Sequence, residues 1–119
     1  MLTRQEFKNG YNMVIEKLCR FGYVDKAYDI LPKVLRTGSR NDVASCNLLI
    51  GAYLKNGLAV KAYNVACRVF NRNLAPNLEI CKKVSDRLDL DGFKIEGRKL
   101  REKFVERGII SPQILEHSG

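Results

Sequence analysis

The residues that could do chemistry in this chain of 119 residues are few and lie far apart. Its four cysteines, Cys19, Cys46, Cys67 and Cys81, form no C-x-x-C pair, and the single histidine is His117. A zinc site needs clustered Cys and His ligands, so this spacing predicts no metal site. It indicates reduced thiols that pack as small apolar groups in a reducing compartment.

The acidic residues offer no better catalytic site. Asp86, Asp89 and Asp91 are close enough in sequence to suggest a metal-dependent nuclease, but Asp91 lies on a different helix face from the other two. Such a group is more typical of a solvated helix face. The chain also lacks a glycine-rich phosphate loop and the H-x-E and P-C-x-x-C motifs of a zinc deaminase. The sequence therefore predicts no enzyme and no cofactor.

The charge of the chain gives the first indication of a partner. Its 21 Lys and Arg residues and 13 Asp and Glu residues give a net charge of +8. Residues 43–77 contain no acidic residue, and their basic residues are Lys55, Lys61, Arg68 and Arg72. A basic domain with such an acid-free stretch favours a polyanionic partner.

The sequence shows no membrane segment or targeting segment. No stretch of about 18 apolar residues is present, so no membrane-spanning helix and no membrane partner are expected. The first ten residues, MLTRQEFKNG, lack the apolar core of a secretory signal and the Ser/Arg-rich composition of a transit peptide. We expect that the chain acts where it is made, that an address has been removed, or that it is part of a longer protein.

A period of 35 residues runs through the chain. Gly22, Gly57 and Gly92 are each 35 residues apart, and so are the small residues Ala27, Ala62 and Gly97. Each unit contains two apolar stripes at helical spacing. The glycines at 22, 57 and 92 follow the first stripes, and Gly38, Asn73 and Gly108 follow the second, where a left-handed residue can end a helix. The pattern predicts helices over residues 9–21, 24–37, 44–56, 59–72, 79–91 and 94–107, with a turn of helix near 112–117. No segment alternates with period two, so no sheet is expected.

The predicted fold class is an all-α solenoid of about three helix-turn-helix repeats. The expected divisions are residues 1–7, repeat 1 at 8–42, repeat 2 at 43–77, repeat 3 at 78–112, and a tail at 113–119. Thr3 and Glu6 form a T-x-x-E capping box, so residues 1–7 are either a helical lead-in or the remnant of a preceding repeat. Ser45 is a candidate helix N-cap. Polar residues in the first helix of repeat 3 are typical of a terminal capping repeat; they are Lys82, Ser85, Asp89 and Asp91.

The segment from Tyr11 to Leu31, YNMVIEKLCRFGYVDKAYDIL, closely resembles the pentatricopeptide repeat (PPR). That pattern is Y-N-x-L-I-x-x-L-C-x-x-G-x-x-D-x-A-x-x-L-L. The second unit matches it at Asn47, Leu49, Ile50, Gly57 and Ala62, and the third unit at its glycines and apolar positions. The resemblance covers residues 8–112. The tetratricopeptide pattern fits less well, because its period is about 34 residues and its Trp signature is missing.

The resemblance implies a right-handed α-α superhelix whose first helices line a groove and read single-stranded RNA, one base per repeat. It places base-reading pairs at Asn12 with Asp42, Asn47 with Asn77, and Lys82 with Pro112. The first pair is similar to a uridine-preferring combination and the second to a cytidine-preferring one, whereas the third fits no base-reading pair. Asn amides suit this role because they can donate and accept on a base edge.

Further positions of the family pattern bear on binding. Arg20 and Lys55 occupy the position at which family members contact phosphate, and Leu90 replaces them in the third unit. Family members usually carry Val or Ile near each repeat's start, to sandwich the base. The residues found there in this chain are Asn9, Ala44 and Glu79.

The expected function is therefore single-stranded RNA binding in organellar RNA metabolism, in a mitochondrion or plastid. Two competent repeats would read two bases, at about 1–3 kcal/mol each, which gives weak affinity. We expect a longer array, a homo-oligomer or a larger ribonucleoprotein to supply the remainder. The alternative is a protein-binding scaffold or a structural subunit of a ribonucleoprotein such as an organellar ribosome, because solenoid grooves also bind peptides.

Overall fold

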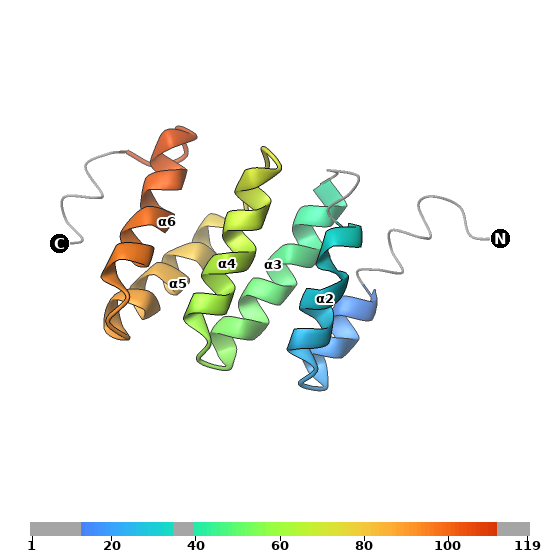
Figure 1. Cartoon of the computed structure of the whole chain (residues 1–119). Helices are drawn as coiled ribbons and strands as arrows, with labels where there is room; N and C mark the ends of the chain where they lie inside the picture. Colours follow the sequence, from blue (N-terminus) through green and yellow to red (C-terminus); the bar gives the residue numbers. More distant parts are fainter. Residues whose placement is uncertain (1–12, 35–39, 112–119) are drawn as a thin grey trace.

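The structure, a computed structural model, describes residues 13–34 and 40–111, with the side chains of 34 and 40–42 excepted. It is built of helices in two layers (Figure 1). After the helical residues 13–20 come α2 (Val24–Val34), α3 (Arg40–Lys55), α4 (Ala59–Asn71), α5 (Leu78–Leu90) and α6 (Lys94–Glu106). The described ranges contain no strand. The prediction of an all-α helical-repeat solenoid is confirmed.

Within the described residues the helix boundaries agree with the predicted ones to within one residue, except at the start of α3; the predicted start at residue 9 and the predicted end at residue 37 lie outside these ranges. This helix begins at Arg40, about one turn before the predicted residue 44. The prediction that Ser45 is an N-cap is wrong, because Ser45 lies inside α3 and its side chain is buried. Residues 40–45 contain neither Gly nor Pro, so nothing in this stretch interrupts a helix. The predicted capping box at Thr3, the stop at Gly38 and the turn near 112–117 lie outside the described residues.

The turn inside each repeat explains the spacing of the glycines. Gly22, Gly57 and Gly92 all have positive φ, at 85°, 74° and 90°. In the second repeat the backbone N–H of Gly57 donates to the Leu54 carbonyl at 3.0 Å, and that of Leu58 donates to the Tyr53 carbonyl at 2.9 Å. This is a Schellman cap, which needs a left-handed residue at its centre. Asn73, after α4, has φ 59°, as predicted for an Asn in the place of glycine.

The small-residue column lets the two helices of each repeat pack closely. Ala27 and Ala62 are fully buried, and so is Gly97 at the equivalent position of the third repeat. Around them a continuous apolar core runs through the repeats. Its largest fully buried side chains include Ile15, Leu31, Leu49, Ile50, Tyr53, Leu88, Leu100 and Phe104.

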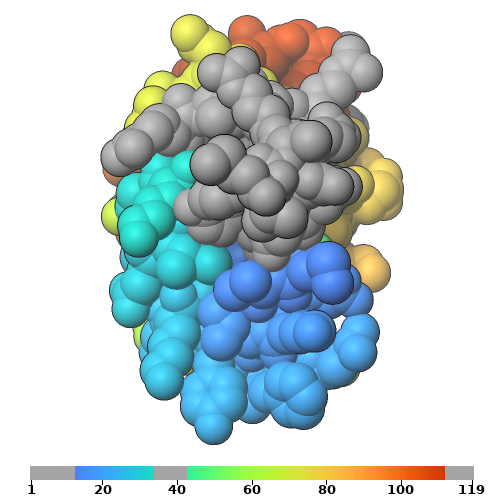
Figure 2. All heavy atoms as spheres, turned by 90° about the vertical axis from the view of Figure 1, so that its right-hand side faces the viewer, coloured from blue at the N-terminus to red at the C-terminus, as the bar shows by residue number. Residues whose placement is uncertain are grey.

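The repeats stack so that first helices pack on first helices and second helices on second helices. Contacts of this kind join α3 with α5 and α4 with α6 (Figure 1). Viewed from the end at which α2 lies, α2 and the helical residues 13–20 stand side by side as the two layers (Figure 2). The turns inside the repeats lie along one edge of the solenoid, and the C-terminal ends of α2, α4 and α6 lie along the opposite edge.

Polar and aromatic contacts fix the junctions between repeats. At the first junction, the Tyr53 hydroxyl and the Lys61 ammonium donate to the Asp25 carboxylate at 3.0 and 3.1 Å. The two hydrogen bonds lower the pKa of Asp25, and burial raises that of Tyr53. At the second junction, the rings of Phe70 and Phe104 meet edge to face with centroids 5.0 Å apart.

The third repeat replaces three apolar positions with a polar network. Where the second repeat carries Ile50, Leu54 and Ala66, the third carries Ser85, Asp89 and Arg101. The Arg101 guanidinium donates to the Asp89 carboxylate at 2.9 Å and to the Ser85 hydroxyl. Each of the three side chains forms a hydrogen bond, which offsets part of the cost of placing polar groups where the second repeat is apolar. The network is only partly satisfied, because the Asp89 Oδ1 and Arg101 Nε atoms are buried without a hydrogen-bond partner among the described residues.

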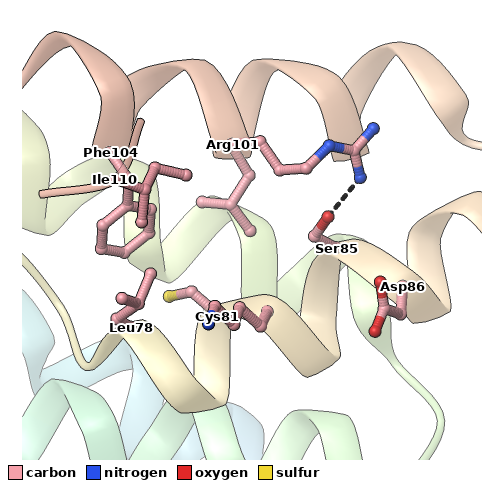
Figure 3. A pocket seen from close by; sticks show the side chains of 9 residues that line it. Leu78, Cys81, Ser85, Asp86, Arg101, Phe104 and Ile110 are labelled. Carbon is pink, nitrogen blue, oxygen red and sulfur yellow. Dashed lines mark hydrogen bonds between the residues drawn. The ribbon is translucent and has the colours of Figure 1, made fainter. Parts of the chain in front are cut away.

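Beside this network lies a hollow of about 180 Å³ between α5 and α6 (Figure 3). Its apolar wall comes from Leu78, Cys81, Leu100, Phe104 and Ile110, and its polar rim from Lys82, Ser85, Asp86 and Arg101. The residues at the equivalent positions of the second repeat include Cys46, Ile50, Val65, Ala66 and Val69, all of which are buried. The hollow therefore corresponds to the surface with which the second repeat packs against the third.

Replacing Leu88 with Ala should lower the free energy of unfolding by about 2–5 kcal/mol, because truncation opens a cavity in a small core. Leu88 is fully buried, whereas Leu90 in the same helix is 82% exposed and provides the matched control. Leu90→Ala should change stability by less than about 0.5 kcal/mol. Urea unfolding followed by circular dichroism measures both variants. Equal losses would show that the buried stripe has been misassigned.

Gly97→Ala tests the close approach of α5 and α6. Alanine usually stabilises a helix interior by about 1 kcal/mol relative to glycine. Here an added Cβ would overlap the Asp89 carboxylate and lie 3.1 Å from the Ser85 carbonyl oxygen, so we expect a loss of about 1 kcal/mol or more. The loss should be smaller in an Asp89→Ala background, as measured by a double-mutant cycle. A gain in stability in the wild-type background would contradict this packing.

Candidate nucleic-acid interface

The first helices expose a regular row of residues on the side away from the second helices. On α3 this face carries the exposed Ala44, Leu48 and Lys55 and the half-buried Asn47 and Gly51, at spacings that keep them on one side of the helix. The equivalent row on α5 consists of Glu79, Lys82, Lys83, Asp86 and Leu90. Of the predicted site residues, Asn47 and Lys55 therefore share one face of one helix.

The structure brings Asn47 and Asn77 together, although they are 30 residues apart in sequence. The backbone N–H of Asn77 donates to the Asn47 side-chain oxygen at 2.8 Å. This bond fixes the orientation of the Asn47 amide, because its oxygen is held by the backbone of the next repeat. The Asn47 NH2 group is left facing away from that backbone.

Asn77 also has a structural role that the repeat pattern did not predict. It is the N-cap of α5, and its side-chain oxygen accepts a hydrogen bond from the Ile80 backbone N–H at 2.9 Å. An Asn directly before the apolar run of α5 was a sequence signal for this cap. In the described part of the chain, the NH2 groups of Asn47 and Asn77 donate no hydrogen bond, so both are available to a ligand.

The two predicted phosphate contacts differ in their surroundings. Lys55 lies in the last turn of α3, and no acidic group of the described residues comes within ion-pair distance of its ammonium. Arg20 instead forms an exposed ion pair with Glu16 at 2.9 Å. Such a pair contributes about 0–1 kcal/mol, so a phosphate can displace it at modest cost.

The third repeat offers no comparable pair on its first helix. The Lys82 ammonium lies 3.9 Å from the Glu79 carboxylate, and Pro112, its predicted partner, is outside the described residues. Leu90 is exposed at the position that Lys55 holds in the second repeat. Ala44 and Glu79, at the positions where family members sandwich the base, are exposed as well.

The predicted pair of the first repeat is not placed by the structure. Asn12 and Asn9 lie outside the described residues, and only the backbone of Asp42 is described, in the first turn of α3. The uridine-preferring combination therefore stays a prediction.

None of the four cysteines forms a disulfide, and burial raises the pKa of two of the thiols. Cys46 and Cys81 are buried, and Cys19 and Cys67 are half-buried. Burial raises the pKa of Cys81 to about 12 and also raises that of Cys19, so both are protonated at neutral pH. Within the described ranges no three Cys, His, Asp or Glu side chains are grouped as metal ligands. No helix there is long and apolar enough to cross a membrane.

The PPR repeat family matches this chain twice, at residues 11–38 and 44–72. These two segments correspond to the first and second helical pairs. The chain is a pentatricopeptide repeat protein, and such repeats are helical modules that bind RNA. Comparison with curated proteins and with solved structures gives no significant match.

The cap role of Asn77 can be separated from a role in binding. Asn77→Ala should lower the free energy of unfolding by about 1 kcal/mol, because the Ile80 N–H loses its acceptor. Asn77→Asp should leave stability within about 0.5 kcal/mol of wild type, since Asp caps as well as Asn does. Thermal and urea unfolding of the two variants measure the difference. Equal destabilisation by both would show that the side-chain oxygen is not the cap.

Proposed function

We propose that this protein binds single-stranded RNA along its first-helix layer and that Asn47 and Asn77 together face a cytidine. The observation that supports the proposal is the hydrogen bond from the Asn77 backbone to the Asn47 oxygen. It joins the two residues that the family pattern assigns to one base, and it orients the amide of the first.

The available hydrogen-bonding groups of this pair favour one base over the others. Both side-chain oxygens accept backbone hydrogen bonds, so each residue offers its NH2 group. On the Watson–Crick edge of cytosine, O2 and N3 are neighbouring acceptors that can receive two such donors. Uracil carries a donor at N3 and guanine at N1, which would oppose an amide donor. A good pair of contacts of this kind is worth about 1–3 kcal/mol of discrimination.

Lys55 would contact the phosphate next to this base. It is exposed on the same face of α3 as Asn47, two turns further along the helix, and has no acidic partner in the described part of the chain. Arg20 would do the same in the first repeat after leaving Glu16. These contacts do not depend on sequence, so they supply affinity and register while the Asn pair supplies specificity.

The proposed biological setting is organellar RNA metabolism in a mitochondrion or plastid, on the strength of the family resemblance. One fully described base-reading pair gives only weak binding, because each base contributes about 1–3 kcal/mol. We therefore place the chain beside further repeats, a second copy or other components of a ribonucleoprotein. No reaction is proposed, and the role of the protein would be to hold RNA.

The test compares Asn77→Asp with wild type on short oligonucleotides that differ at one base. Wild type should prefer cytidine, and Asn77→Asp should shift the preference towards uridine by about tenfold, or about 1.4 kcal/mol. The reason is that a carboxylate accepts from the N3–H of uracil, whereas cytosine presents an acceptor there. Because this substitution preserves the cap, folding is held constant. Fluorescence anisotropy at low salt measures the affinities.

Lys55→Gln serves as the control in the same titrations. It should weaken binding to every sequence alike and lower the slope of log K against log salt by about 0.7, the value for a single strand. If Asn77→Asp changes no preference while Lys55→Gln weakens binding, the RNA is held by charge alone and the base-reading assignment is wrong.

A protein-binding scaffold is a second candidate, and one observation favours it. The residues that follow the turn glycines, Tyr23, Leu58 and Phe93, are 55%, 41% and 44% exposed at equivalent positions of the three repeats. They give one edge of the solenoid an apolar row. If wild type binds none of the oligonucleotides at low salt, this candidate takes precedence.

A further inference from the structure

The positive charge of the protein is concentrated on the layer opposite the proposed RNA-binding face. The two layers differ in net charge when each helix is counted with the residue that directly follows it. The second helices α4 and α6, with Arg72 and Arg107, carry nine basic and three acidic residues, a net charge of +6. The first helices α3 and α5, with Asn56 and Asp91, carry five basic and five acidic residues. The first-helix layer of these two repeats is thus neutral.

Five cations of the second layer lie at or near the C-terminal ends of their helices. Lys33, Arg68 and Lys103 occupy the same position in α2, α4 and α6, at steps of 35 residues. Arg72 and Arg107 follow α4 and α6, and Lys99 lies one turn before Lys103. We call these six residues the basic face. The helix ends that carry them lie along one edge of the solenoid (Figure 1).

Within the described residues, none of these six cations has an acidic group within 4 Å. The nearby glutamate Glu102 is occupied instead by Arg98 at 3.0 Å. Asp29, Glu96 and Glu106 are the remaining acidic residues of the three second helices that form no ion pair there. The charge of the basic face is therefore available to a ligand.

Aromatic rings hold several of these cations in place. The Arg68 guanidinium lies over the Tyr28 ring at 4.7 Å, and Lys103 and Arg107 lie over Phe70 at 5.8 and 5.6 Å. Arg107 also donates to the Phe70 carbonyl at 2.9 Å. Each contact restrains a long side chain, so less entropy is lost when the cation binds a ligand. The helix dipoles also favour cations here, since Arg72 and Arg107 are the C-cap residues of α4 and α6, but the dipoles do not account for the aromatic contacts that hold Arg68, Lys103 and Arg107.

We propose that the basic face is a second RNA-binding surface, which contacts the phosphate backbone of double-stranded RNA. α4 packs on α6, and packed helices lie about 8–10 Å apart, so the equivalent cations Arg68 and Lys103 are neighbours that an elongated polyanion can follow, with Lys33 at the same position of the first repeat. Asn64 and Asn71 are exposed on α4 along the same stripe as Arg68. Their amides can hydrogen bond to phosphate oxygens or 2′-hydroxyls.

A duplex fits this surface better than a single strand does. Single-strand binding sites without sequence preference stack bases on exposed aromatic rings. The aromatic rings at the basic face, Tyr28 and Phe70, lie beneath cations, and the exposed rings of Phe21, Tyr23 and Phe93 lie at the turns on the opposite edge. The surface therefore offers phosphate contacts without base stacking, which is how double-stranded RNA is recognised.

An anionic membrane fits less well, because lipid binding by a helical surface needs apolar side chains beside the cations. Ile109 is exposed next to Arg107, but the other large apolar residues exposed on the second helices and their turns lie at the opposite edge; they are Tyr23, Leu58, Phe93 and Ile95. The surface is basic rather than amphipathic.

The test uses the whole chain and a blunt RNA duplex of roughly 16 base pairs, the length that double-stranded RNA-binding domains cover. The triple variant Arg68→Gln, Arg72→Gln, Lys103→Gln should weaken duplex binding at least tenfold. It should also lower the slope of log K against log salt by about 0.9 per lost contact, the value for duplex DNA. Fluorescence anisotropy at several salt concentrations measures both quantities.

The matched control removes three charges from the opposite layer through Lys55→Gln, Lys82→Gln and Lys83→Gln. It should change duplex affinity less than threefold, whereas single-strand binding should depend on it and not on the first variant. Equal loss of duplex binding in the two triple variants would overturn the proposal, since net charge alone would then explain it. Failure of base discrimination by Asn77 would leave this proposal standing, so the two tests are independent.

Two further arms keep the test decisive. If the first triple variant loses helicity in circular dichroism, Arg72→Gln with Lys99→Gln replaces it, because both residues are exposed and hold no partner among the described residues. This pair should still weaken duplex binding more than Lys55→Gln with Lys83→Gln does. Sedimentation with vesicles of phosphatidylcholine and phosphatidylserine tests the lipid alternative. Vesicle binding through the basic face without duplex binding would overturn the assignment to RNA.

Discussion

The left-handed turn between the two helices of each repeat is the constraint on which the other features depend. Gly22, Gly57 and Gly92 supply the positive φ that lets the chain reverse within a Schellman cap. The reversal brings the second helix back along the first, and the small residues five positions later let the two approach closely. Neither helix could bury its apolar stripe alone, so the stacking of repeats follows from this turn.

The sequence predicted the parts of the fold that this turn determines. Helix positions, the left-handed Asn73 and the buried small-residue column all follow from a 35-residue period and from the backbone preferences of Gly and Asn. The start of α3 was misplaced because Ser45 resembles a cap, although its position on the helix faces the core. A local propensity was overruled there by the tertiary burial of that helix face.

The polar contacts could not be predicted in the same way. Asp89 was read as one of a group of exposed carboxylates, and its pairing with Arg101 requires the packing of α5 on α6. The sequence signal for this pairing is a pair of differences between repeats. The third repeat has Asp89 where the second has Leu54, and Gly97 where the second has Ala62. The missing Cβ of Gly97 provides the space that the carboxylate occupies. The charge difference between the layers likewise needed the helix pairs to be placed in space.

The two faces of the solenoid suit different parts of RNA binding, namely base discrimination and phosphate contact. The first-helix face of the two C-terminal repeats is neutral and carries the oriented Asn47 and Asn77 pair, which suits discrimination between bases. The second-helix face is basic and suits phosphate contacts. The most direct measurement is nuclear magnetic resonance of the Asn side-chain NH2 groups during titration with a short cytidine oligonucleotide. The account predicts that the signals of Asn47 and Asn77 shift while those of Asn64 and Asn71 do not; shifts confined to Asn64 and Asn71 would contradict it.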